Sequence, residues 1–165
     1  AAQKRLEWFL LAMPASHSPL RDGDDQEPPA PLLHRFRMPS RREAVAPAVD
    51  RILEAVQPLG LDSDQLNDLA IALAEALSNA AVHGHGLDGR RQVRVAVAVQ
   101  PHQRAVIEVR DSGNGFDSGA VSDPTDPARV LVPGGRGVFL MRQLVDRLEY
   151  NGAGNRVRLT VERRR

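Results

Sequence analysis

The 165-residue chain carries 22 Lys and Arg residues against 21 Asp and Glu residues, a formal net charge of +1. This balance excludes a strong overall field toward nucleic acid or membrane surfaces. The absence of cysteine excludes disulfides and cysteine-ligated zinc. No apolar run reaches the roughly 18 residues of a membrane-spanning helix, and the charged N-terminal stretch is unlike a secretion signal. We therefore expect one cytoplasmic domain with a proper core.

The N-terminal segment differs in composition from the rest of the chain. Residues 4–13 have the apolar spacing of a short amphipathic helix. Residues 14–31 contain five prolines and an acidic cluster, which is typical of a flexible linker. We expect residues 1–31 to form a helix and linker, and residues 32–165 to form the folded domain.

The folded domain is predicted to begin with a strand and a helix. Residues 32–38 alternate as an edge strand does, and Ser40 is a plausible cap for the helix that follows. Apolar residues then recur at helical spacing over residues 45–57, and the Pro-Leu-Gly sequence at residues 58–60 breaks that helix.

The central helix is predicted over residues 66–86, with its cap at Asp62 or Ser63 and its end at two glycines. One face is an apolar stripe, formed by Leu66, Leu69, Ala70, Leu73, Leu77, Ala80 and Ala81. The opposite face places Glu75 and Asn79 one turn apart, and its other members are Ala72, Ala76 and His83. A carboxylate and a carboxamide framed by alanines leave room for a ligand.

The second half is predicted to add two hairpins, a loop and a helix. Alternating valines over residues 93–99 and 106–109 indicate an antiparallel hairpin with one covered face. Residues 117–135 have the composition of a long loop of the lid or binding type. Helical spacing returns over residues 138–148, and a hairpin around residues 151–154 ends the domain. This order predicts an α+β two-layer sandwich, with helices covering one face of a mixed, mostly antiparallel sheet.

Two glycine-rich motifs flank the predicted loop. DSGNGF follows the second hairpin strand, so Asp111 lies at the sheet edge, and Gly113 and Gly115 allow close backbone approach or a positive φ. GGRG, with Gly135, Arg136 and Gly137, opens the next helix, where free N–H groups and the helix dipole favour an anion. Alone, the first motif is equally compatible with a ligand site and with a simple turn or a calcium-like loop. The second motif alone is equally compatible with a phosphate site and with a flexible hinge.

Taken in order, EALSNAAVHGHG, VRDSGNGF and GGRGVFLMRQLVD resemble the GHKL ATPases, whose Bergerat fold is shared by histidine kinases, gyrase and MutL. The wording is most similar to the anti-sigma-factor serine kinases. The resemblance covers about residues 32–162. It implies binding of ATP and Mg²⁺, homodimerisation, phosphorylation of a serine on an antagonist protein, and control of a sigma factor by partner switching.

The resemblance also implies a role for each motif residue. Asn79 matches the Mg²⁺ ligand, and Glu75 matches the general base that acts on a serine hydroxyl, or on water in an ATPase. Asp111 matches the acceptor for the adenine amino group, with Gly113 and Gly115 giving space to the ring. Gly135 and Gly137 match the phosphate-binding box. Arg136, inside that box, either neutralises a phosphate or lies in solvent.

This sequence departs from some of these kinases at one position. They carry an arginine before the second glycine box that reaches the γ-phosphate, whereas Pro133 stands near that position here. His83 matches the same motif as Asn79 and is expected to pack or hydrogen-bond at the helix end. A histidine kinase catalytic domain and a non-catalytic, nucleotide-dependent regulator-binding module remain as alternatives. Three terminal arginines without aromatic neighbours are typical of a solvated tail and do not indicate nucleic-acid binding.

Overall fold

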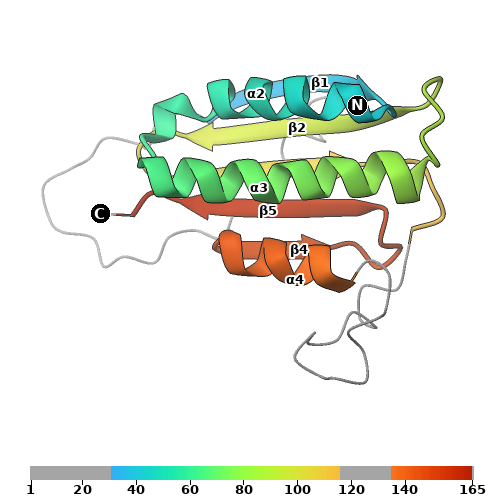
Figure 1. Ribbon diagram of the computed structural model, residues 1–165. Helices are drawn as coiled ribbons and strands as arrows, with labels where there is room; N and C mark the ends of the chain where they lie inside the picture. Colours follow the sequence, from blue (N-terminus) through green and yellow to red (C-terminus); the bar gives the residue numbers. More distant parts are fainter. Residues whose placement is uncertain (1–30, 116–134, 165) are drawn as a thin grey trace, which may run out of the picture.

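The computed structural model describes residues 31–115 and 135–164 of the chain. In these ranges, five strands and three α-helices form two layers, and the helices lie on one face of the sheet (Figure 1). The strands are β1 (Leu32–Pro39), β2 (Gln92–Gln100), β3 (Arg104–Arg110), β4 (Arg147–Tyr150) and β5 (Arg156–Glu162). The helices are α2 (Val45–Ala55), α3 (Ser63–Asn79) and α4 (Gly135–Leu144). Short helical turns are η1 (Arg42–Ala44), η2 (Gln57–Leu59) and the π-helical η3 (Ala80–Gly84).

The sheet has the strand order β1-β2-β3-β5-β4, and every neighbouring pair is antiparallel. The α+β sandwich with helices on one face is thus confirmed, whereas the expected mixture of parallel and antiparallel pairs is wrong for the described strands. The reason lies in the last hairpin: β4 turns directly into β5, and β5 runs back between β4 and β3, antiparallel to both. The predicted N-terminal helix and linker lie outside the described residues, as does the loop predicted over residues 117–135 except for its last residue, Gly135, which begins α4.

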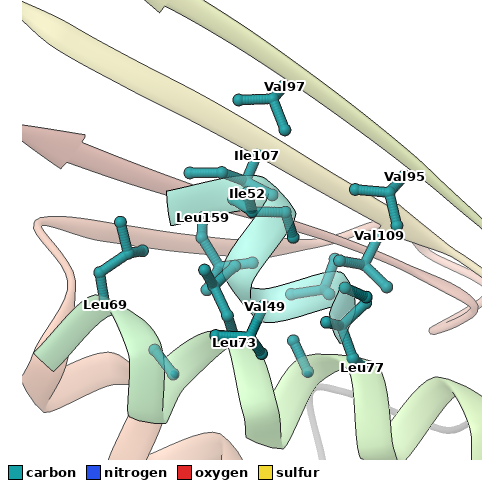
Figure 2. Close-up of a cluster of buried hydrophobic side chains, with 14 of the residues drawn as sticks. Val49, Ile52, Leu69, Leu73, Leu77, Val95, Val97, Ile107, Val109 and Leu159 are labelled. Carbon is teal, nitrogen blue, oxygen red and sulfur yellow. The ribbon is translucent and has the colours of Figure 1, made fainter. Parts of the chain in front are cut away.

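The core fills the space between the helices and the sheet. Alternate residues of β2 and β3 face α2 and α3, so the valine alternation in the sequence becomes one wall of the core (Figure 2). Ile52 of α2, Leu73 of α3 and Ile107 of β3 are all fully buried. Burial of this stripe fixes the rotation of α3 about its axis, and therefore fixes which of its residues face the opposite side.

The two predicted helix caps have different outcomes. Asp62 caps α3 as predicted, because its Oδ1 accepts a hydrogen bond from the Gln65 N–H (2.8 Å). Ser40 does not cap the next helical segment, because η1 has Arg41 at its N-cap position and no side-chain cap. The Ser40 hydroxyl is buried and bonds instead to His85, a residue 45 positions away. Within the described residues, no helix is long and apolar enough to cross a membrane.

Candidate functional site

Glu75 lies half-buried on α3, where it faces the first turn of α4. A Cβ atom added to Gly137 would overlap the Glu75 carboxylate and displace it from this position. Glu75, predicted as a base, therefore contacts the second glycine box directly, although Gly137 lies 62 positions further along the chain. A helix N-terminus carries unpaired N–H groups, so an anion bound there would lie beside Glu75.

Asn79 is the last residue of α3, one turn beyond Glu75 and also half-buried. The sequence suggested that the alanines on this face leave room for a ligand. They do not, because Ala72 is fully buried and Ala76 is 2% exposed. Their small side chains allow α4 to pack closely against α3. The site is thus restricted to the C-terminal end of α3, around Glu75 and Asn79.

Asp111 lies where β3 ends, and its carboxyl group packs on the backbone of η3. A Cβ atom on Gly84 would overlap this carboxyl group, and a Cβ atom on Gly113 would overlap the Gly84 carbonyl oxygen. The Gly113 N–H donates a hydrogen bond to Asp111 Oδ1 (2.7 Å). Glycine is needed at position 84 because the Asp111 side chain packs on its Cα atom, and at position 113 because the loop touches the backbone of the helical turn. The Asp111 loop is thereby joined to the helix that carries Glu75 and Asn79.

The turn between β4 and β5 supports the same loop from its other side. The Asp111 N–H donates to the Asn155 carbonyl oxygen (3.1 Å), and Asn155 Nδ2 donates to the Gly113 carbonyl oxygen (3.3 Å). Asn151 Nδ2 in turn donates to Asn155 Oδ1 (2.9 Å). Gly115 has a φ of 72° and contacts the Ala153 carbonyl so closely that a Cβ atom would overlap it. In the structure, Gly113 and Gly115 thus serve packing between chain segments.

His85 connects three segments beside Asp111, and sequence analysis missed it. Its Nε2 accepts a hydrogen bond from the Ser112 N–H (2.9 Å) and lies 2.9 Å from Ser112 Oγ. Because Nε2 is an acceptor, the ring proton is on Nδ1, which donates to Ser40 Oγ (2.6 Å). The imidazole therefore joins the end of β1, the end of η3 and the Asp111 loop. His83, expected to pack or bond at the helix end, is exposed instead.

Burial lowers the pKa of His85 below 6.5, although the Asp111 charge acts in the opposite direction. The unfolded chain therefore binds a proton at higher pH than the folded chain. The stability that the neutral ring contributes is present above about pH 6.5 and is lost as the pH falls through the lowered pKa. Protonation of Nε2 also removes the acceptor for the Ser112 N–H.

We expect His85→Ala to lower the free energy of unfolding by about 2 kcal/mol near pH 7.5, because Ser40 Oγ and the Ser112 N–H lose their partner. Urea denaturation at several pH values measures this effect. The difference between parent and variant should shrink as the pH is lowered to about 5.5. The control, His83→Ala, alters an exposed ring two residues away and should change stability by less than about 0.5 kcal/mol. A difference independent of pH would contradict the lowered pKa of His85.

Tyr150, at the end of β4, lies in the electrostatic environment of Glu75 and Arg142. Burial raises the pKa of Tyr150 to about 12, with the Glu75 charge adding to this effect and the Arg142 charge opposing it. The phenol therefore keeps its proton at neutral pH and cannot serve as a base there. Tyr150 therefore lies close enough to Glu75 for the two groups to interact electrostatically, which the short RLEY segment did not reveal in the sequence.

Metal ligands are few in this region. Within the described residues, no group of three or more His, Cys, Asp or Glu side chains could hold a metal ion. An ion at Asn79 would therefore take one carboxamide oxygen from the protein, with water and ligand phosphates completing its coordination. This donor set fits Mg²⁺, which retains water and binds substrate phosphates, and does not fit zinc.

The second glycine box is described in part. Gly135 begins α4, and Arg136 follows it in the same helix. Both N–H groups belong to the first turn of α4, which has no intrahelical acceptors for them. The arrangement unites four elements: α3, η3, the Asp111 loop and the first turn of α4. A helix N-terminus beside one carboxylate, with a second carboxylate packed on the turn that follows α3, is an arrangement that fits the class of nucleotide-binding ATPase domains.

Comparison with known proteins agrees with this class. Residues 38–161 match the family model described as the histidine kinase-like ATPase domain, and the chain therefore belongs to that family. Among curated proteins, it is 24% identical over 122 residues to serine-protein kinase RsbW of Oceanobacillus iheyensis, covering 70% of this chain and 77% of the relative. It is 31% identical over 109 residues to the Bacillus subtilis RsbW, covering 62% and 68% of the two chains.

A solved structure supports the fold alone. The crystal structure of the RsbU and RsbW domains of a Mycobacterium tuberculosis protein superposes with a TM-score of 0.55 at 17% sequence identity. The match covers 81% of this chain and 32% of that longer chain. The resemblance inferred from the three sequence motifs is thus confirmed at the level of the family and of its RsbW group.

Proposed function

We propose that this chain is an ATP-dependent protein serine kinase that acts as an anti-sigma factor by partner switching. The observation that carries the proposal is the convergence of the three motifs, with Gly137 against Glu75 and Gly84 against Asp111. The names of its relatives, serine-protein kinases, point to the same activity. A sigma factor and a serine-bearing antagonist are the proposed partners of a homodimer in the cytoplasm.

The proposed binding mode assigns one part of the nucleotide to each motif. The Asp111 carboxylate accepts a hydrogen bond from the adenine amino group, because Oδ1 is already engaged by Gly113 and the second oxygen remains for a ligand. N–H groups of Gly135, Arg136 and Gly137 bind the phosphates at the start of α4. Asn79 offers its carboxamide oxygen to Mg²⁺. When bound, that ion neutralises the charge that develops on the transferring phosphate.

The proposed chemistry uses Glu75 as the base. The serine oxygen of the antagonist forms a bond to the γ-phosphorus while the bond between that phosphorus and the β,γ-bridging oxygen breaks, and ADP leaves. The serine proton passes to the Glu75 carboxylate, which lies against the turn that holds the phosphates. The position of Glu75 beside this helix end, and not elsewhere on α3, is what makes the transfer geometrically feasible.

Incubation with γ-labelled ATP, Mg²⁺ and a serine-bearing antagonist protein tests the proposal. We expect acid-stable label on the antagonist, no label when its acceptor serine is replaced by alanine, and no label when EDTA is present. Acid-labile label on a histidine of this chain would support the histidine kinase alternative. ATP-dependent binding of a regulator without any transfer would support the non-catalytic module.

A further inference from the structure

The sheet face away from the helices carries a row of arginines that the proposed nucleotide site does not use. Val93, Val95, Val109 and Val157 point to the helices and are buried. Side chains alternate along a strand, so the residues between these valines point to the opposite, helix-free face. Figure 1 shows this face behind the helical layer. The arginines of interest all lie on it.

Four of these arginines are direct cross-strand neighbours. Arg37 of β1 pairs with Arg94 of β2, Arg94 pairs with Arg110 of β3, and Arg110 pairs with Arg156 of β5. We call these four residues the arginine row. Strands lie about 4.8 Å apart, so the row spans about 14 Å. Arg37, Arg94 and Arg110 are exposed, and Arg156 is half-buried.

Two acidic residues of the same face form ion pairs with other arginines. Glu108 forms an ion pair with Arg158 (3.3 Å), and Glu149 forms one with Arg147 (2.8 Å). Among the described residues, no ion pair joins Arg37, Arg94 or Arg110 to a carboxylate. Like charges that face each other across strands destabilise a sheet. Arg37, Arg94 and Arg110 therefore oppose folding slightly, and no ion pair among the described residues compensates for their charge.

We propose that the arginine row docks an acidic segment of a partner protein. A guanidinium group donates two parallel N–H groups to one carboxylate, so the exposed guanidinium groups of Arg37, Arg94 and Arg110 fit a short extended run of Asp and Glu residues. Arg110 directly precedes Asp111, and Arg156 directly follows Asn155, which bonds to the Asp111 loop. The docked segment therefore lies at the end of the sheet that holds this loop. The inference does not depend on the proposed kinase activity.

The surroundings of the row favour a polypeptide over nucleic acid or a lipid surface. The described strands place both of their aromatic residues, Phe36 and Tyr150, opposite core valines on the helix side, so no base could stack beside the row. Glu108 and Glu149 neutralise Arg158 and Arg147 beside the row, so these two arginines do not extend its positive charge, and the row is too short for a long polyanion. The net charge of +1 also provides no long-range attraction for such a polyanion.

Fluorescence anisotropy with the full chain and a labelled peptide of eight alternating Asp and Glu residues tests the proposal. The double variant R94Q/R110Q should bind this peptide about tenfold more weakly than the parent. The control R42Q/R164Q removes the same charge from exposed positions outside the row and should change affinity less than about twofold. The melting temperature of R94Q/R110Q should equal or exceed that of the parent, because repulsion within the row decreases.

Equal peptide affinity of the parent and R94Q/R110Q would overturn the proposal. It would also be overturned if a single-stranded oligothymidine, or vesicles containing phosphatidylserine, bound the parent more tightly than the peptide and lost that binding in R94Q/R110Q. Weaker binding of the peptide alone, with the oligonucleotide and vesicles unaffected, supports an acidic protein segment as the occupant.

Discussion

Glu75→Gln is expected to reduce the rate of phosphate transfer to a serine-bearing partner by about a thousandfold, since a positioned general base contributes on the order of 10² to 10⁴ to such a rate. The amide keeps the size of the side chain and its contact with Gly137, but it cannot accept the serine proton. The dissociation constant of ATP should stay within about threefold of the parent value, because Glu75 acts on the attacking hydroxyl and not on the nucleotide.

Single-turnover transfer of label from ATP, with a separate titration of nucleotide binding, measures both quantities. Glu54→Gln is the control, since Glu54 is an exposed carboxylate on α2 and its loss should leave the rate unchanged. A variant at Glu75 that transfers phosphate at the parent rate would remove this residue from the mechanism. Loss of both ATP binding and transfer would show instead that Glu75 takes part in binding the nucleotide.

Much of this arrangement could be predicted because the patterns that indicate it are local in the sequence. Helical periodicity is enough to place Glu75 and Asn79 on one face of α3, away from the buried leucines. Strand alternation is enough to place Asp111 directly after a buried strand. The order of the three motifs then predicts the family, and the family implies that they converge. Distances between them could not be predicted from periodicity.

The contacts that could not be predicted join residues far apart in the chain. Ser40 looked like a helix cap because its local context fits one, yet its hydroxyl bonds to His85. Nothing near His85 in the sequence reveals that Ser40 and Ser112 are its partners. The need for glycine at position 84 has the same origin, because only the fold brings Asp111 onto its Cα atom. Tertiary contacts decide these roles.

Register is a second kind of information that sequence alone withholds. Strand alternation predicts that Arg94 and Arg110 point away from the core, but not that they face each other. A shift of one residue between strands would turn one of these side chains to the opposite face. The arginine row exists only because the β1-β2, β2-β3 and β3-β5 registers all align it.

Asp111→Asn is expected to weaken ATP binding by about 10-fold to 100-fold, the loss that follows from removing one hydrogen bond to a charged acceptor. The variant can still accept the Gly113 N–H through its carbonyl oxygen, as Oδ1 does in the parent (2.7 Å). Its amide NH₂ group then faces the adenine amino group, and two donors oppose each other. Guanine presents an oxygen acceptor at the corresponding ring position, so the preference for ATP over GTP should decrease. The melting temperature should change little.

Calorimetric titration with ATP and GTP, together with a melting temperature for each variant, measures this specificity change. Asp50→Asn provides the control, because Asp50 is an exposed carboxylate on α2 and should leave both affinities unchanged. Unaltered ATP affinity in Asp111→Asn would show that this carboxylate serves only the Gly113 turn and its packing on Gly84. If the affinity for ATP decreases while the affinity for GTP decreases less or increases, the adenine amino group lies at Asp111. Only a direct contact at the base distinguishes the two nucleotides.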